Sequence, residues 1–76
     1  MNSQKKWSFK EAYHSLPYNE MQSVRAEIEE AVGIKNSVVW YNRLNGLVEP
    51  KASEYIAITR IFAKRGIKAF NNDLIN

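Results

Sequence analysis

The side chains best suited to specific recognition chemistry form one arc of a short segment near the middle of the chain. On a helical wheel at 100° per residue, this arc contains Val38, Tyr41, Asn42 and Asn45. An asparagine amide both donates and accepts hydrogen bonds, so it can pair with N6 and N7 of adenine; a valine methyl can contact the thymine methyl, and a tyrosine hydroxyl can donate to a phosphate. The arc is uncharged and suited to recognising base edges, although the same residue types also occur on ordinary solvated helices.

Catalytic groups are scarce by comparison. The chain has one histidine, His14, and no cysteine, so it cannot complete a transition-metal site of the usual composition. Glu27, Glu29 and Glu30 are close together, but an acidic helix face is usually just solvated, and no calcium-binding loop accompanies them. We therefore expect no catalytic residue, no metal site and no cofactor, and we expect that the protein is not an enzyme.

Size and composition predict one small globular domain. The 76 residues are 45% hydrophobic and 25% charged, which are ordinary values for a folded domain of this length. No window approaches 18 consecutive apolar residues and no secretory leader pattern is visible, so we expect a cytoplasmic protein without a membrane segment. The net charge is +3, and residues 17–33, with four glutamates and one arginine, are the acidic segment. This balance permits binding to a polyanion without requiring it.

Hydrophobic spacing predicts helices throughout and no strands. A capping box of Ser8 and Glu11 should start the first helix, and Pro17 should interrupt it and begin the second, which ends near Gly33. The apolar stripes of these two helices are Phe9, Ala12, Tyr13 and Leu16, followed by Met21, Val24, Ile28, Ala31 and Val32. We therefore expect an all-α fold, a compact domain of four to five helices.

The third and fourth helices follow from cap residues and glycines. Asn36 or Ser37 should cap a short helix over residues 38–45 that stops at Gly46. Its inward face is predicted to contain Trp40, Leu44 and Leu47, with Val39 and Arg43 on the flanks. After a loop over residues 47–50, a fourth helix should bury Tyr55, Ile58, Ile61 and Phe62 and stop at Gly66. We expect one domain over residues 1–76, with a core of about 8–66 and a tail, 67–76, that is a short helix or an extended arm.

The segment from Arg25 to Gly46 has the organisation of a helix-turn-helix: a helix, a glycine turn, a capped short helix and a glycine stop. It resembles the helix-turn-helix of the lambda-repressor-like (Cro/C1-type) DNA-binding family, over roughly residues 18–66. Gly33 matches the turn glycine of that family, and Ile28, Val32 and Ile34 match its apolar positions. Two features depart from the family pattern: Glu29 stands where a small residue is usual, and the stretch from Gly33 to Gly46 is one residue longer than is common.

The resemblance implies that the helix over residues 38–45 enters the major groove while the helix before it braces it. We therefore expect sequence-specific binding of duplex DNA, as in a small transcriptional regulator. Lys35 and Lys51 lie in the two adjacent loops and are expected to contact phosphates, although a loop lysine is usually only solvated. The candidate DNA-binding residues are Lys35, Asn36, Ser37, Val38, Tyr41, Asn42, Asn45 and Lys51. Arg43 is left open, because it can also pair with Glu49 or Glu29.

A protein-interaction module is the alternative function. The same helical fold could dock a partner through its acidic segment or its apolar tail and have no useful affinity for DNA. We also expect weak self-association through Phe70, Leu74 and Ile75, because a single module contacts only a few base pairs. Charge placement discriminates between the two functions. Lysines that share a face with Asn42 favour DNA binding, whereas Glu27, Glu29 or Glu30 on that face would oppose it.

Overall fold

The computed structural model describes residues 6–70, and within this range the chain forms four helices and no strand. The helices are α1 (Lys10–His14), α2 (Tyr18–Val32), α3 (Ser37–Leu44) and α4 (Ala52–Ala63). The all-α prediction is therefore confirmed, with four helices in the described part of the chain. None of these helices is long and apolar enough to cross a membrane.

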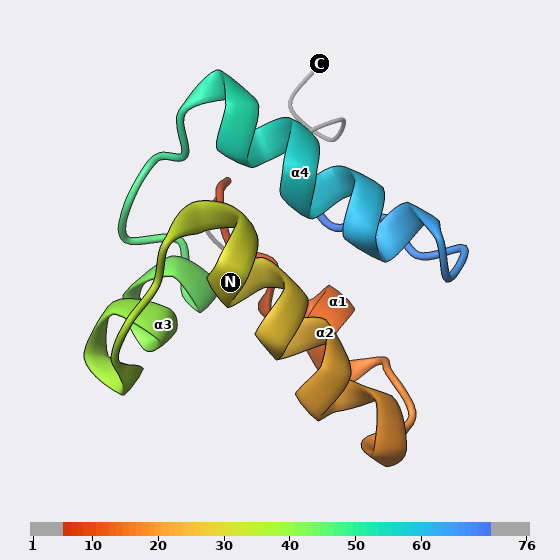
Figure 1. Cartoon of the computed structure of the whole chain (residues 1–76). Coiled ribbons are helices and arrows are strands. Elements are labelled where there is room, and N and C mark those ends of the chain that lie inside the picture. The colour runs from red at the N-terminus through yellow and green to blue at the C-terminus, as the bar shows by residue number, and fades with distance from the viewer. Residues whose placement is uncertain (1–5, 71–76) are drawn as a thin grey trace, which may run out of the picture.

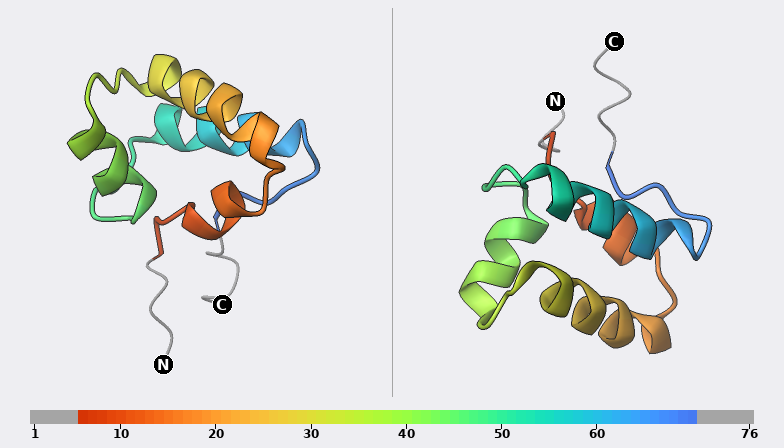
Figure 2. Two further views of the ribbon diagram at one scale, coloured as in Figure 1. Left: turned by 90° about the horizontal axis from the view of Figure 1, so that it is seen from below. Right: turned by 45° about the horizontal axis from the view of Figure 1, so that its top comes forward.

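The helices form a compact domain around a packed pair, α2 and α4, which run in opposite directions (Figures 1 and 2). α1 covers one face of this pair, and α3 closes the end at which α2 stops and α4 begins. The segment after α4 turns back toward the first described residues (Figure 2). The two ends of the described chain therefore both contribute to the same side of the core.

The first helix begins one residue later than a cap at Ser8 predicts, so Ser8 lies just before the N-cap residue. α1 begins at Lys10, and its N-cap residue, Phe9, provides no side-chain cap. The Ser8 hydroxyl accepts the Lys10 amide at 3.1 Å and donates to the Leu44 carbonyl at 2.8 Å. The buried hydroxyl thus satisfies its donor at the end of α3 and accepts from the first residue of α1.

α2 ends as its sequence predicts, at Gly33 in the left-handed conformation with φ of 75°. This glycine allows the chain to leave the helix without a Cβ penalty. Val24 and Ile28 are fully buried, and Met21 and Val32 are partly buried. Ala31, which was predicted to belong to the apolar stripe, is exposed.

α3 begins at Ser37 because Asn36 caps it: the Asn36 side-chain oxygen accepts the Val39 amide at 2.9 Å. The helix ends at Leu44, one residue before the predicted end. Leu47 is 59% exposed, so its predicted place on the inward face is wrong. The helical wheel does not extend to Leu47, since the chain has already left the helix.

The core is built around aromatic side chains from separate segments. Phe9 lies at its centre, with ring centroids 5.8 Å from Trp40, 6.1 Å from Phe62 and 6.0 Å from Phe70. Edge-to-face contacts of this kind add to the free energy gained from burying the rings. The buried apolar residues are Phe9, Ala12, Tyr13, Leu16, Val24, Ile28, Ile34, Trp40, Leu44, Ile58, Ile61, Phe62, Ala69 and Phe70.

The segment that follows α4 corrects the expectation of an uncovered apolar tail. Phe70 is only 3% exposed, and its ring stacks on Tyr55 with centroids 4.9 Å apart and contacts Trp7 at 6.2 Å. It is therefore a core residue and offers no surface for self-association. Leu74 and Ile75, the other residues of the predicted dimer seam, lie outside the described residues. The predicted core range of 8–66 must accordingly be extended to include residues 69 and 70.

Candidate nucleic-acid interface

α3 lies at one end of the molecule, between the turn that joins it to α2 and the loop that leads to α4 (Figures 1 and 2). Trp40 and Leu44 fix the inner face of α3 in the core, with 1% and 3% exposure. On the outer face, Val38 is 70% exposed and Tyr41 is 52% exposed. A rigidly held helix thus presents one face to solvent at an end of the domain, which is the geometry that insertion into a groove requires.

The predicted amides on α3 differ in their freedom to bind a ligand. Asn45 donates its side-chain N–H to the Tyr41 carbonyl at 2.9 Å, and the Asn36 oxygen is engaged in the helix cap. The Asn42 side chain, in contrast, makes no hydrogen bond to any described residue. Asn42 therefore retains the paired donor and acceptor that recognition of a base edge needs.

The other predicted contacts surround the start of α3 and of α4. Lys35 and Lys51 are exposed, and neither ammonium group forms an ion pair within the described range. Ser37, the first residue of α3, is exposed, and its hydroxyl lies 3.5 Å from the Arg25 guanidinium. The candidate residues are thus distributed over α3, the turn before it and the loop after it, at one end of the domain (Figure 2).

Arg43 does not contribute to the outer face of α3, because it forms an ion pair that was not predicted. Its guanidinium donates to both carboxylate oxygens of Glu54, at 2.9 and 3.4 Å, and both side chains are about 15% exposed. The expected partners, Glu49 and Glu29, are therefore wrong. Hydrogen bonds from Arg43, and from the Lys51 amide, hold the pKa of Glu54 below its usual range. The pair joins the last turn of α3 to the first turn of α4.

Sequence reasoning missed the contribution of Arg25. Its guanidinium lies over the Trp40 ring at 4.8 Å and near the Tyr41 ring at 5.9 Å, and its Nε donates to Glu29 at 2.9 Å. The hydrogen bond with Glu29 raises the pKa of Arg25. The spacing of four residues between Arg25 and Glu29 could have revealed the ion pair, whereas the contact with both rings depends on how α2 crosses α3.

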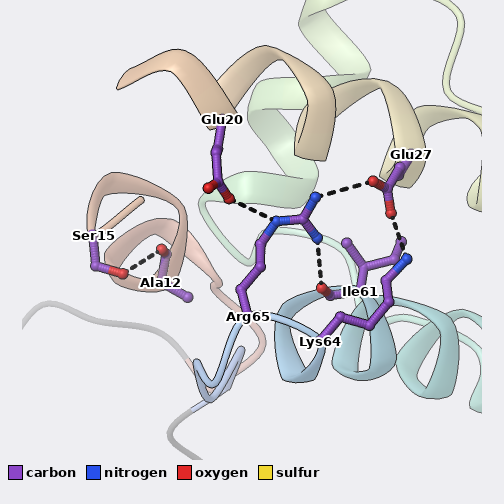
Figure 3. Close-up of polar contacts among 7 residues, drawn as sticks. All are labelled: Ala12, Ser15, Glu20, Glu27, Ile61, Lys64 and Arg65. Carbon is purple, nitrogen blue, oxygen red and sulfur yellow. Dashed lines mark hydrogen bonds and ion pairs between the residues drawn. The ribbon is translucent and has the colours of Figure 1, made fainter. Parts of the chain in front are cut away.

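Two of the four acidic residues of α2, Glu20 and Glu27, pair with basic residues at the end of α4 and just after it. Figure 3 shows Arg65 between two carboxylates, with Nε 3.0 Å from Glu20 and a terminal nitrogen 3.2 Å from Glu27, while Lys64 contacts Glu27 at 3.1 Å. Arg65 also donates to the Ile61 carbonyl at 3.1 Å. These two carboxylates are therefore neutralised at the seam between α2 and α4. Glu29, nearer α3, is neutralised by Arg25.

A shallow cavity of about 240 Å³ opens where α1 meets α2. Its lining residues are Tyr13, Tyr18, Asn19, Met21 and Gln22. Burial raises the pKa of the Tyr13 phenol, which keeps it neutral and unsuited to act as a base. Across residues 6–70, no three histidine, aspartate or glutamate side chains gather in a way that could hold a metal ion. His14 is exposed in the last turn of α1, with its ring 5.7 Å from that of Tyr13.

Searches against protein-family models, curated proteins and solved structures find no match to this chain.

Proposed function

We propose that the protein binds duplex DNA by inserting the exposed face of α3 into the major groove, as a small transcriptional regulator would. The observation that carries this proposal is the contrast between the two faces of α3. Trp40 and Leu44 anchor the inner face, whereas Val38, Tyr41 and Asn42 on the outer face carry no charge. Of these three, only Tyr41 has a described partner on another helix, the Arg25 guanidinium 5.9 Å from its ring. A helix fixed in this way can bring side chains to base edges without first having to become ordered.

The distribution of charge supports the same function. Lys35 and Lys51 flank α3 and are free to meet phosphates, which repel carboxylates and attract ammonium groups. The carboxylates of Glu27 and Glu54 are already paired with basic side chains, so they offer little repulsion to a polyanion. We assign base recognition to Asn42 and contact with the DNA phosphates to Lys51.

Fluorescence anisotropy with wild type and two variants tests this assignment. Asn42→Ala should weaken binding to a selected duplex by about 1–3 kcal/mol and leave binding to a scrambled duplex unchanged, because a bidentate amide contact exists only with the right base. Lys51→Ala should weaken both equally and reduce the slope of log affinity against log salt by about one. Lys68→Ala, a lysine of the segment that follows α4, is the matched control and should leave the binding to both duplexes nearly unchanged.

A protein-docking function is the second candidate, favoured by a specific observation. Of the seven large apolar side chains that are exposed in the described range, five lie within residues 38–48. They are Val38, Val39, Tyr41, Leu47 and Val48. Such clustering is typical of a binding surface. Titration of isotope-labelled protein with a mixed-sequence duplex discriminates between the two functions. Amide shifts in α3 that weaken with salt support DNA binding. The absence of any shift at micromolar protein would exclude DNA binding and favour docking.

A further inference from the structure

α3 is a helix with almost no charge. Its sequence, SVVWYNRL, contains one ionisable group that is charged at neutral pH, Arg43. The bidentate pair with Glu54 holds this guanidinium at 16% exposure, on the side of the helix that packs toward α4. The outer face of α3 is therefore left with methyl groups, a phenol and amides.

These groups match one kind of base pair. Guanine is read mainly by arginine or lysine through O6 and N7, and cytosine by a carboxylate that accepts from N4. α3 itself supplies neither to its outer face, because Arg43 is held by Glu54 and the helix contains no acidic residue. Arg25 of α2, which lies over the Trp40 ring, is paired with Glu29. Adenine is read by an asparagine amide through N6 and N7, and thymine by an apolar contact with its methyl group. Asn42 and Val38 supply these two contacts.

The positions of Asn42 and Val38 fit a single short site. They are four residues apart on α3, so they lie one above the other on the same face, about 6 Å apart along the helix axis. Base pairs stack about 3.4 Å apart, so two such side chains span about two base steps. Val38 is 70% exposed, and the Asn42 amide has no partner among the described residues, so both can reach a base without breaking an existing contact.

We propose that α3 selects A·T base pairs in the major groove, with Val38 against a thymine methyl and Asn42 bonded to adenine within about two to three base pairs. This inference rests on the proposed DNA-binding function and names its class of target. The discrimination depends on Arg43 staying with Glu54, because a released arginine on α3 could bind guanine.

Chemically altered duplexes test the two contacts one at a time. Equal-length hairpins are titrated by anisotropy: a mixed A·T stem, the same stem with uracil for thymine, the same stem with 7-deazaadenine for adenine, and a mixed G·C stem. We expect wild type to bind the A·T stem at least about fivefold more tightly than the G·C stem. Uracil, which lacks only the methyl group, should weaken binding by about fourfold per contacted methyl.

Variants assign each effect to a residue. Val38→Ala should remove the difference between thymine and uracil stems, while Val48→Ala, an exposed valine of the loop that is 40% exposed, should retain it. Asn42→Ala should remove the sensitivity to 7-deazaadenine, while Asn19→Ala on α2 should retain it. All four side chains are at least partly exposed, so each variant is expected to fold.

The outcomes separate this inference from the function on which it rests. Salt-dependent binding that is equal for all the stems, or stronger for G·C, would overturn A·T selection and leave DNA binding intact. A preference for A·T stems that is unchanged by uracil and by 7-deazaadenine would also overturn the proposed contacts, because the protein would then be recognising duplex shape. If no stem binds at micromolar protein and low salt, the DNA-binding function itself fails.

Discussion

The hydroxyl of Ser8 donates a hydrogen bond to the carbonyl oxygen of Leu44 at 2.8 Å, across 36 positions of the sequence. The amide of Phe9 donates to the same oxygen at 3.2 Å. Carbonyl groups in the last turn of a helix have no partner within the helix, so these two bonds satisfy one that would otherwise be buried without a donor. The segment before α1 thus holds the end of α3 in place.

Gly46 permits this contact, and we expect Gly46→Ala to be among the most damaging small substitutions in the chain. An added Cβ would lie 2.6 Å from the Ser8 nitrogen, and the glycine has φ of 78°. Left-handed backbone costs alanine about 1–2 kcal/mol, and forcing the two segments apart should cost about 1–3 kcal/mol more. The measurement is urea unfolding followed by circular dichroism.

Gly33→Ala is the matched control. Gly33 has nearly the same backbone conformation, φ of 75°, but a Cβ there would meet nothing within 4 Å. Gly33→Ala should lower the free energy of unfolding only by the cost of the left-handed backbone, about 1–2 kcal/mol. Equal losses for the two variants would show that the approach of Ser8 to Gly46 contributes nothing to stability.

Trp40 should contribute more to stability than any other side chain of α3. It is 1% exposed and contacts the rings of Phe9 and Tyr13 at 5.8 and 5.3 Å. Trp40→Ala should lower the free energy of unfolding by about 3–5 kcal/mol. The adjacent Tyr41→Ala, at a ring that is 52% exposed, is the control and should cost about 1 kcal/mol or less. A thermal midpoint for Trp40→Ala within a degree or two of wild type would contradict the assigned orientation of α3.

The burial of Phe70 predicts where the chain can be shortened. A chain that ends at Lys68 lacks the ring that stacks on Tyr55 and contacts Phe9, so it should lose about 3–5 kcal/mol and much of its helical circular dichroism. A chain that ends at Phe70 keeps this ring and should retain most of its stability. Sedimentation of the chain ending at Phe70 against the full chain then tests weak self-association through Leu74 and Ile75, which is excluded if both are monomers at high concentration.

The pair of Arg43 and Glu54 should fix how α3 meets α4. Its charges are mostly shielded from water, so Arg43→Met or Glu54→Gln should each cost about 1.5–3 kcal/mol in urea unfolding. The double variant should lose less than the two single losses added together, because the second change removes a group that has already lost its partner. Strictly additive losses would show that the ion pair does not couple the two helices.

The carboxylate of Glu27 should make stability depend on acid pH. The hydrogen bond from Lys64, together with that from Arg65, lowers the pKa of Glu27. Because the folded pKa is the lower one, the unfolded chain binds more protons as the pH falls, so this stabilisation is present above about pH 4.3, the pKa of a free glutamate, and is lost below it.

Thermal unfolding across pH 3–7 measures this effect. Glu27→Gln should be less stable than wild type near neutral pH and should lose less stability on acidification. Glu30→Gln is the control, since Glu30 is exposed and forms no ion pair within residues 6–70, and its profile should follow that of wild type. Indistinguishable profiles for Glu27→Gln and wild type would rule out a contribution from the ion pairs with Lys64 and Arg65.

Local patterns in the sequence determined the helices and most of their inward faces. Pro17, Asn36 and Gly33 mark helix ends because each acts on its own turn of backbone, through a fixed φ, a capping side chain or a left-handed conformation. The apolar stripe that includes Phe9 and Tyr13 is buried as its spacing predicts, since helical periodicity places those side chains on one face whatever the partner is. The outward positions of Val38 and Tyr41 follow from the same periodicity.

Only the tertiary structure decided which segments meet. Three contacts illustrate this, and each joins residues at least ten positions apart in the sequence. They are the hydrogen bond from Ser8 to Leu44, the ion pair of Arg43 with Glu54, and the ring contact of Phe70 with Phe9. Glu49 is nearer to Arg43 in the sequence than Glu54 is, and no local rule selects the more distant carboxylate. The choice depends on how α2, α3 and α4 pack, which is a property of the whole core, and it determines which charged and amide groups at α3 remain free to meet a ligand.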